Sequence, residues 1–378
     1  RRKKSFTIRG NKAEAQRQLR ERLVALDKGL PVDTSKETVG EFLDRWLDTY
    51  VKLNTSPKTY YDYAGMIRRY LKPALGQIPL TKLSPQAIQG LHAGMYEKGL
   101  SSRSVQYVHK TLKQSLKHAV KWGMVGRNVC DLVDSPRPRR KEMQCLNLSD
   151  IHRLLDATAG STYGHIFHLA IFTGVRRGEL LALRWSDVDL QSKTLSVNQA
   201  LSSITGKGVI AGDPKTRNSR RLVSLPPSAI GLIRSLKARQ MEQYEAAGLA
   251  WDESRFVFCN SDGGPMSPDT ITHAFKRIAS KLGLSKVRFH DLRHSHATLM
   301  LKAGVHPKIV SERLGHASIN ITLDTYTHIL PGLQEAAALA FEESLAVRSA
   351  ENPLNGADDR RVPKMSPIMD FQGLHAVS

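Results

Sequence analysis

The stretch FHDLRHSHATLM, residues 289–300, places His290, His294 and His296 within seven positions, with Arg293 among them. On a helix, His290 and His294 have the i, i+4 spacing of a zinc-binding pair. Such a site needs further ligands, and the permanent charge of Arg293 would disfavour a metal ion beside it. His290 and Arg293 share a helix face, where an imidazole and a guanidinium fork suit a phosphate that undergoes chemistry. The stretch favours a phosphate site, although an isolated H-x-x-R pair is common and often superficial.

The composition points to an anionic partner. The 378 residues include 56 Lys and Arg against 35 Asp and Glu, which gives a formal net charge of +21 and a pI near 10.0. Such a charge favours nucleic acid or an anionic membrane surface. The sequence shows neither an apolar run of about 18 residues nor a secretory leader, so no membrane-spanning segment is expected. Three widely spaced cysteines fit neither a disulfide framework nor a thiolate zinc site, and they indicate a reducing, cytoplasmic compartment.

The chain is too long for one compact domain. Its patterning predicts five segments: a basic arm or the end of a larger module (1–33), a helical bundle (37–133), a basic linker (134–144), a mixed region of helices and a small antiparallel sheet (145–345), and a tail without its own core, expected to be disordered (346–378). Within the bundle, Ser-Pro pairs at Ser56 and Ser84 mark helix starts, because serine caps a helix and proline fits its first turn.

Two basic stretches are candidate DNA contacts. In SSRSVQYVHKTLKQSLKHAVKWG, residues 101–123, apolar side chains share one helix face, and another face carries Lys110, Lys113, Lys117 and Lys121. A solvated lysine face is the alternative, but the net charge favours a stripe that follows phosphates. The linker DSPRPRRKEMQ, residues 134–144, adds Arg137, Arg139 and Arg140, which would lie along a DNA backbone.

Three further motifs supply candidate site residues. TGVRRGELLALRW, residues 173–185, places Arg176 after a glycine break, with Glu179 one turn later. DPKTRNSRRLVSLP, residues 213–226, places Lys215 at a turn before a strand. LGHASINITLDTYTH, residues 314–328, contains His316 and, ten residues later, Tyr326.

Together with HDLRHSHAT, these motifs occur in the order and spacing of the tyrosine recombinase family, and the chain resembles phage or mobile-element integrases in particular. The resemblance covers roughly residues 145–340, extends more weakly over the helical region, and is least specific for the basic N-terminal segment. It implies a mainly α fold with a small antiparallel sheet in the catalytic domain. A SAM-like core-binding bundle and this domain would form a C-shaped clamp around duplex DNA.

The family's chemistry requires no metal or cofactor. By resemblance, Tyr326 would attack the scissile phosphate and form a 3′-phosphotyrosine, storing the energy of the broken bond. Arg176 and Arg293 would clamp the non-bridging oxygens in the transition state. Glu179 would support Arg176 from beneath.

Three residues would manage protons and hydrogen bonds in the same reaction. Lys215 would protonate the leaving 5′-oxygen, and Lys207 in the same hairpin region is the alternative for this role. His290 would assist proton transfer at the tyrosine, and His316 would hydrogen-bond a phosphate oxygen. His294 and His296 match no catalytic position of the family and are interpreted as packing or polar-core residues.

The resemblance also implies partners. These are double-stranded DNA at core attachment sites, with arm sites as a further option, a homotetramer assembled on that DNA, and accessory DNA-bending or directionality proteins. The segment LQEAAALAFEESLAV predicts a C-terminal helix that docks either on its own domain or on a neighbouring protomer. The alternatives are a Xer-like cellular resolvase, a catalytically silent DNA-binding regulator and a type IB topoisomerase-like enzyme. A metal-dependent phosphodiesterase is disfavoured because a carboxylate-rich ligand set is missing from the sequence.

Overall fold

The structure is a computed structural model that describes residues 11–27, 36–138, 143–212, 220–326, 338–339 and 341–342. The candidate residues Lys215, Arg139 and Arg140 therefore lie outside the described residues, as do most of the expected C-terminal helix and the tail. The chain divides into two compact units, Arg1–Tyr326 and Thr327–Ser378, and the elements below belong to the first.

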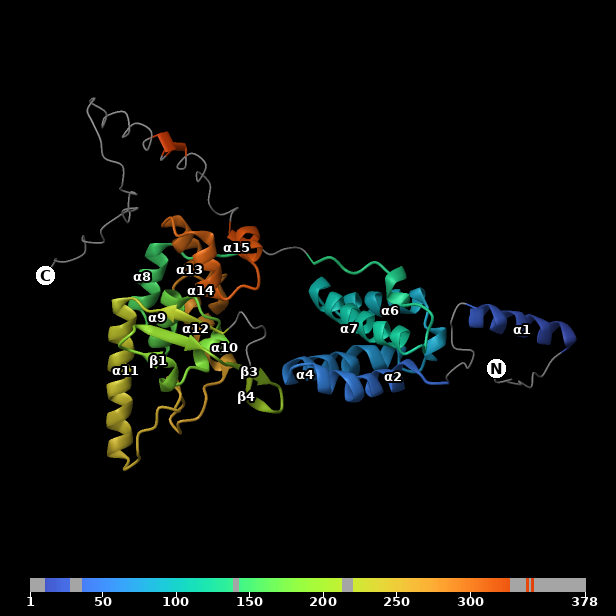
Figure 1. Cartoon of the computed structure of the whole chain (residues 1–378), viewed down its shortest axis with the longest axis horizontal. Coiled ribbons are helices and arrows are strands. Elements are labelled where there is room, and N and C mark those ends of the chain that lie inside the picture. The colour runs from blue at the N-terminus through green and yellow to red at the C-terminus, as the bar shows by residue number, and fades with distance from the viewer. Residues whose placement is uncertain are drawn as a thin grey trace, which may run out of the picture. The chain divides into compact units, whose positions relative to one another are not determined.

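The N-terminal half of this unit is helical (Figure 1). Helix α1 (Lys12–Asp27) comes first, and the bundle that follows consists of α2 (Val39–Trp46), α3 (Lys52–Asn54), α4 (Pro57–Met66), α5 (Lys72–Leu75), α6 (Pro85–Glu97) and α7 (Ser102–Lys121). Two π-helical turns, Leu47–Val51 and Ile67–Leu71, join α2 to α3 and α4 to α5 without a break. The side chains of Ser56, Ser84 and Ser101 accept hydrogen bonds at the starts of α4, α6 and α7, so both expected serine caps are present.

Helix α7 has the apolar face that the sequence predicts. Val105, Val108, Leu112, Leu116 and Ala119 are at most 2% exposed, and they pack in one core with residues of α2 and α6. Burial of an aliphatic side chain of this size contributes about 1.5–3 kcal/mol, so this face fixes the helix in the bundle. The opposite face of α7 is left to solvent.

The C-terminal half surrounds a second core and combines helices with short strands. Its helices are α8 (Leu148–Asp156), α9 (Thr162–Thr173), α10 (Arg177–Leu181), α11 (Pro227–Ala246), α12 (Pro268–Lys281), α13 (Phe289–Lys302), α14 (Pro307–Leu314) and α15 (Ile319–Tyr326). Its strands are β1 (Val188–Asp189), β2 (Thr194–Val197), β3 (Ala200–Ile204), β4 (Gly208–Gly212) and β5 (Arg221–Ser224). The mainly helical fold class with small antiparallel sheets is confirmed.

The strands form two sheets where the sequence predicts one. Antiparallel β1, β2 and β5 make the first, with Leu195 of β2 opposite Val223 of β5. Strands β3 and β4 pair only with each other and form a separate hairpin. Leu195 and Val223 are nearly fully buried, so the first sheet contributes to the core beside the helices.

Aromatic packing fixes the helices that carry the site. Phe167 of α9 meets Phe275 of α12 and Phe289 of α13 edge to face, with ring centroids 5.3 and 5.9 Å apart. Edge-to-face pairs of this kind stabilise by about 0.5–1.5 kcal/mol beyond burial. Among the described residues, no helix is both long enough and apolar enough to span a membrane.

Candidate active site

Two helices end on left-handed glycines whose neighbouring carbonyls point into one site. Gly174 follows α9 and Gly315 follows α14, each with φ of 65°. A Cβ atom at position 174 would lie 2.5 Å from Cδ2 of His296 and 2.8 Å from Cδ2 of Leu314, so only glycine fits there. Carbonyl groups at a helix C-terminus carry partial negative charge, and they are ready acceptors for cationic side chains.

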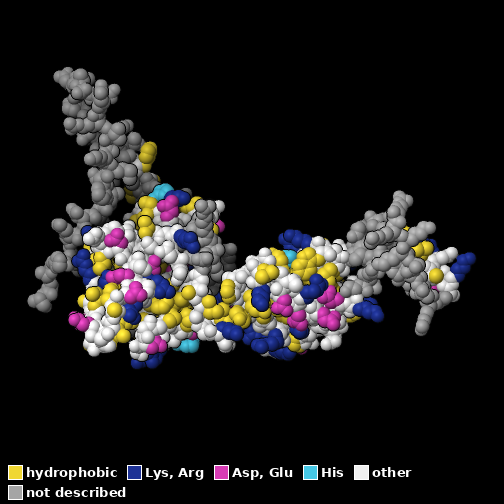
Figure 2. Space-filling view, turned by 60° about the horizontal axis from the view of Figure 1, so that its bottom comes forward, with side chains coloured by type: hydrophobic (Ala, Val, Ile, Leu, Met, Phe, Trp, Pro, Cys, Tyr) yellow, Lys and Arg dark blue, Asp and Glu magenta, His cyan; other side chains and the backbone are white. Residues whose placement is uncertain are grey.

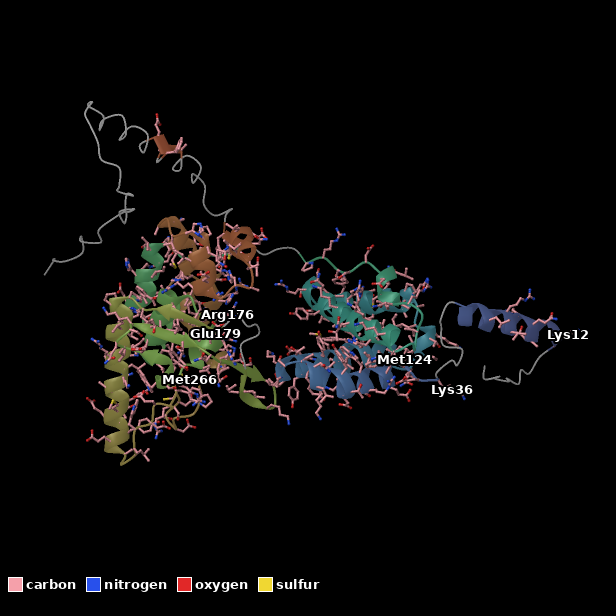
Figure 3. All side chains as sticks on the ribbon, in the orientation of Figure 1. Lys12, Lys36, Met124, Arg176, Glu179 and Met266 are labelled. Atoms are coloured by element: carbon pink, nitrogen blue, oxygen red, sulfur yellow. The ribbon has the colours of Figure 1, made fainter. Side chains whose placement is uncertain are left out.

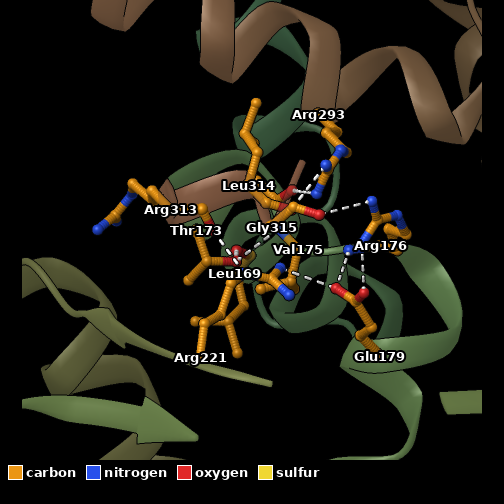
Figure 4. Close-up of polar contacts among 11 residues, drawn as sticks. Leu169, Thr173, Val175, Arg176, Glu179, Arg221, Arg293, Arg313, Leu314 and Gly315 are labelled. Carbon is orange, nitrogen blue, oxygen red and sulfur yellow. Dashed lines mark hydrogen bonds and ion pairs between the residues drawn. The ribbon is translucent and has the colours of Figure 1, made fainter. Parts of the chain in front are cut away.

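Arg293 projects from α13 onto both helix ends. Its Nη1 donates to the carbonyl oxygen of Gly174 at 2.8 Å, and its Nη2 donates to that of Leu314 at 2.7 Å (Figure 4). The side chain is 4% exposed. The rigid fork of a guanidinium places a separate nitrogen on each carbonyl, whereas an ammonium group offers a single nitrogen.

Arg176 and Glu179 lie side by side at the start of α10 (Figure 3). The Arg176 backbone N–H donates to Oε2 of Glu179 at 3.0 Å, and Arg176 Nη1 donates to Oε1 at 2.7 Å. Arg176 Nη2 also donates to the carbonyl oxygen of Gly315 at 3.1 Å. The Arg176 side chain remains 38% exposed, while that of Glu179 is 3% exposed. Glu179 thus holds Arg176 from the protein side, and its supporting role in catalysis stays a prediction.

Arg221 completes this cluster, and sequence reasoning missed it. From the start of β5, its Nη2 donates to Oε2 of Glu179 at 2.8 Å and its Nε to the carbonyl oxygen of Arg313 at 2.7 Å. Burial alone would raise the pKa of Glu179, but the hydrogen bond and charge of Arg221, with the charge of Arg176, lower it overall. The sequence signal was only a basic pair at the head of a strand, which resembles any surface pair.

The cluster carries an excess of positive charge. Three guanidinium groups, those of Arg176, Arg221 and Arg293, lie around the carboxylate of Glu179. Burial and repulsion from Arg176 lower the pKa of Arg293 to about 9. Because a buried charge is costly unless it is paired, the site is prepared for an anion.

Tyr326 ends α15, and its hydroxyl contacts His294, which is interpreted from the sequence as a packing or polar-core residue. Its hydroxyl oxygen lies 2.9 Å from Nδ1 of His294. The tyrosine is 0% exposed, and this burial raises the pKa of its hydroxyl to about 12. His294 therefore has a polar contact inside the fold, and the contact is with the candidate nucleophile.

His290 and His316 stand near these groups without touching the tyrosine hydroxyl in the described contacts. The His290 ring meets that of His294 edge-on at 4.9 Å, and its side chain stays exposed. Desolvation by surrounding atoms, with repulsion from His294 and Arg293, lowers the pKa of His290 to about 4. His316 Nδ1 lies 2.8 Å from Oγ1 of Thr322, and burial lowers the pKa of His316 to about 4.

His296 is a polar-core residue, as the sequence interpretation holds. It is 8% exposed, and its Nε2 accepts a hydrogen bond from Arg313 Nε at 3.2 Å. Arg313 also donates from Nη2 to the carbonyl oxygen of Phe172 at 2.9 Å. Burial and the Arg313 charge lower the pKa of His296 to about 3.

We expect these histidines to make the protein acid-labile. The pKa of His296 is lowered to about 3 and that of His316 to about 4 in the folded protein. Below pH about 6.5 these histidines are therefore protonated in the unfolded chain while they are still neutral in the folded chain. The free energy of unfolding should therefore decrease as the pH is lowered, by about 1.4 kcal/mol per pH unit for each such proton. Urea unfolding between pH 7.5 and 5 measures this slope.

The control is His296→Gln, whose amide oxygen can accept from Arg313 without titrating. It should show a shallower pH slope than the natural protein. Equal slopes in the two proteins would contradict the assignment of His296 to this effect.

Comparison with known proteins now places this site in a family. Residues 144–332 match the Phage integrase family, and residues 38–96 match the phage integrase N-terminal SAM-like domain. A XerC-like tyrosine recombinase of Caldanaerobacter subterraneus subsp. tengcongensis is 32% identical over 338 residues, covering 85% of this chain and 86% of that protein. The chain belongs to the phage integrase family of tyrosine recombinases. The ICEBs1 integrase of Bacillus subtilis is 27% identical, with 78% of this chain and 80% of that protein covered.

As a tyrosine recombinase, the protein is a site-specific recombinase, an enzyme that cleaves and rejoins DNA. Solved integrases share its fold. The Tn1549 transposon integrase in complex with a circular intermediate DNA has a TM-score of 0.68 at 20% identity, covering 81% of this chain and 99% of that one. The lambda integrase tetramer bound to a Holliday junction has a TM-score of 0.55 at 21% identity, with 83% of each chain covered.

The remaining sequence candidates in the recombinase are placed only in part. Lys215 lies between β4 and β5 but outside the described residues, and the alternative, Lys207, sits exposed on the turn between β3 and β4. Arg177 is used structurally, since its Nη1 donates to Thr272 Oγ1. The guanidinium of Arg184 lies over the ring of Phe256, 4.6 Å from its centroid.

The lysine face of α7 is exposed, and its members differ in their contacts. Basic side chains appear on the face of the bundle that Figure 2 shows. Lys110, Lys117 and Lys121 follow one line along α7, whereas Lys113 lies to one side and pairs with Asp131 at 2.7 Å. The pair is exposed on both sides and so contributes little to stability. Arg137 of the linker is described, but its contact with DNA stays a prediction.

Proposed function

We propose that this recombinase integrates or excises a phage or another mobile element by covalent catalysis at Tyr326. The tyrosine oxygen attacks the scissile phosphorus, and the bond from phosphorus to the 5′-oxygen breaks. The products are a 3′-phosphotyrosine and a free 5′-hydroxyl, and the reverse step with a second strand's hydroxyl completes the exchange. Integrases of phages and of ICEBs1 among the relatives favour this function over the resolvase alternative.

The observation that supports this proposal most strongly is the excess positive charge of the arginine side chains around Glu179. Arg176 and Arg293 are fixed by backbone carbonyls and by Glu179 before any ligand arrives. A guanidinium has five N–H donors, and the described contacts use two on each of these arginines, so donors remain for phosphate oxygens. Preorganised donors of this kind stabilise charge that develops in a transition state.

Proton transfer in this proposal is divided among several groups. The phenolic proton must leave Tyr326, and His290 is an exposed, neutral imidazole beside His294 that could receive it. The Nδ1 of His316 is occupied by Thr322, which orients Nε2 for a phosphate oxygen. Lys215 would give a proton to the leaving 5′-oxygen, a role that rests on the resemblance.

The proposed substrate is duplex DNA at the element's attachment sites, gripped between the bundle and the catalytic domain. The related lambda integrase forms a tetramer on a Holliday junction, and we propose the same assembly here. Accessory DNA-bending or directionality proteins would act with it, and residues 1–33 would bind arm sites. The segment 134–144 would serve as the linker along the DNA backbone.

We expect the exposed lysines of α7 to bind phosphates rather than bases. Lys117→Gln should weaken binding to all duplexes by a similar factor and reduce the slope of log affinity against log salt by about 1. Lys113→Gln is the matched control on the same helix, and it should change the slope less because Asp131 already compensates that charge. Fluorescence anisotropy at several salt concentrations measures both. Equal slopes in Lys117→Gln and the natural protein would contradict the proposal that Lys117 binds a DNA phosphate.

The proposed function is tested by covalent trapping. The substrate is a nicked duplex whose sequence is first selected from a random library by binding to the protein. After cleavage, the short DNA piece next to the nick dissociates, so religation is prevented and the enzyme stays attached to the remaining DNA. We expect an adduct that survives detergent and forms equally with and without a chelator. A strict requirement for a divalent metal would contradict the mechanism.

A further inference from the structure

The buried face of α15 is held by two hydrogen bonds between a hydroxyl and a histidine. Thr322 and Tyr326 have i, i+4 spacing and therefore share a helix face, and both are 0% exposed. Oγ1 of Thr322 lies 2.8 Å from Nδ1 of His316, and the hydroxyl oxygen of Tyr326 lies 2.9 Å from Nδ1 of His294. The second bond engages the oxygen that the proposed function requires as nucleophile.

This arrangement does not allow attack on DNA. A nucleophile must come within about 3–3.5 Å of the reacting atom, with its orbital aligned, before the bond can form. The phosphorus of a duplex approaches from solvent, and Tyr326 has no solvent-exposed surface. The bond to His294 therefore belongs to a resting position of the tyrosine, from which the ring must move before cleavage.

The same geometry argues against His294 as the general base. A base that takes the phenolic proton must touch the oxygen in its attacking position, whereas His294 touches it in the buried one. Either tautomer of His294 holds the tyrosine: Nδ1 accepts from the hydroxyl when the ring hydrogen is on Nε2, and Nδ1–H donates to the phenolic oxygen otherwise.

We propose that His294 is a positioning residue that holds Tyr326 in a buried, non-attacking position until DNA binds. This rests on the proposed role of Tyr326 as the nucleophile. Because release exchanges one hydrogen bond for another, the restraint on the cleavage rate is modest, about two- to tenfold. Such a restraint would disfavour attack by the tyrosine outside an assembled complex.

The first test needs no DNA. N-acetylimidazole acetylates accessible tyrosine hydroxyls, and peptide mass spectrometry would follow Tyr326 with Tyr107, which is 54% exposed, as the internal reference. In the natural protein Tyr326 should react much more slowly than Tyr107. His294→Leu should raise the relative rate at Tyr326 about two- to tenfold. His294→Asn, whose side-chain polar atoms can stand near the place of Nδ1, should restore protection.

The second test measures single-turnover cleavage of the selected nicked duplex at saturating protein. Cleavage by His294→Leu should be faster than by the natural protein, with His294→Asn between them. Unchanged acetylation of Tyr326 in His294→Leu, or slower cleavage by it, would overturn the proposal. If His294→Leu lacks the cooperative unfolding of the natural protein, His294→Ala takes its place with the same expectations. If Tyr326→Phe still formed adducts, the proposed function would fail, while the acetylation result would still report whether His294 shields the tyrosine.

Discussion

Tyr326→Phe is expected to bind its DNA site with the affinity of the natural protein and to form no covalent adduct. The substitution removes only the oxygen that would join phosphorus, so the loss of cleavage should be at least about a thousandfold. The fold should remain, since the ring stays in its buried place and one hydrogen bond to His294 is lost. Gel electrophoresis in detergent measures the adduct, and anisotropy measures binding.

The control for this substitution is Tyr107→Phe on α7, whose hydroxyl is exposed and distant in sequence from the site motifs. It should form adducts at the natural rate. A Tyr326→Phe protein that still crosslinked to the nicked duplex would show that another residue is the nucleophile.

Arg293→Lys is expected to lose both activity and stability although it keeps the charge. Lysine offers one nitrogen in place of the two that each serve one carbonyl oxygen, that of Gly174 and that of Leu314, so the hydrogen bond to one helix end should be lost or weakened. An unsatisfied buried carbonyl costs about 1–3 kcal/mol, which should appear as a lower free energy of unfolding. The misplaced cation should also slow cleavage by about 10²–10³-fold, as when a preorganised donor is removed from an oxyanion site.

Lys302→Arg, the same exchange in the opposite direction, is the control at the end of the same helix. Its side chain is exposed, so the exchange should change unfolding and cleavage little. Equal losses in Lys302→Arg and Arg293→Lys would contradict the special place of Arg293.

Much of the fold follows from local sequence signals. The Ser-Pro pairs predict helix starts because a cap and a proline act within one turn. The apolar spacing on α7 predicts its buried face for the same reason. The division of the strands into two sheets could not be predicted, because it depends on which strands pair across the fold rather than on alternation within each one.

In the site, too, contacts within one motif could be predicted from the sequence, whereas contacts between distant motifs could not. Arg176 and Glu179 are three residues apart, so their pairing could be expected from one motif. Arg221 reaches Glu179 across 42 residues, and His294 reaches Tyr326 across 32, and neither contact leaves a local pattern. The contact of His294 with Tyr326 could not be predicted, because the motif shows the neighbours of His294 in sequence and not the helix that ends against it.

Tyr326 should become covalently joined to DNA without help from a metal ion. The most direct measurement is to trap the adduct on the nicked duplex in the presence of a chelator, digest both protein and DNA, and sequence the nucleotide-bearing peptide by mass spectrometry. A 3′-phosphonucleotide on Tyr326 is expected. A nucleotide on any other side chain, or an adduct that forms only after a divalent metal is added, would contradict this expectation.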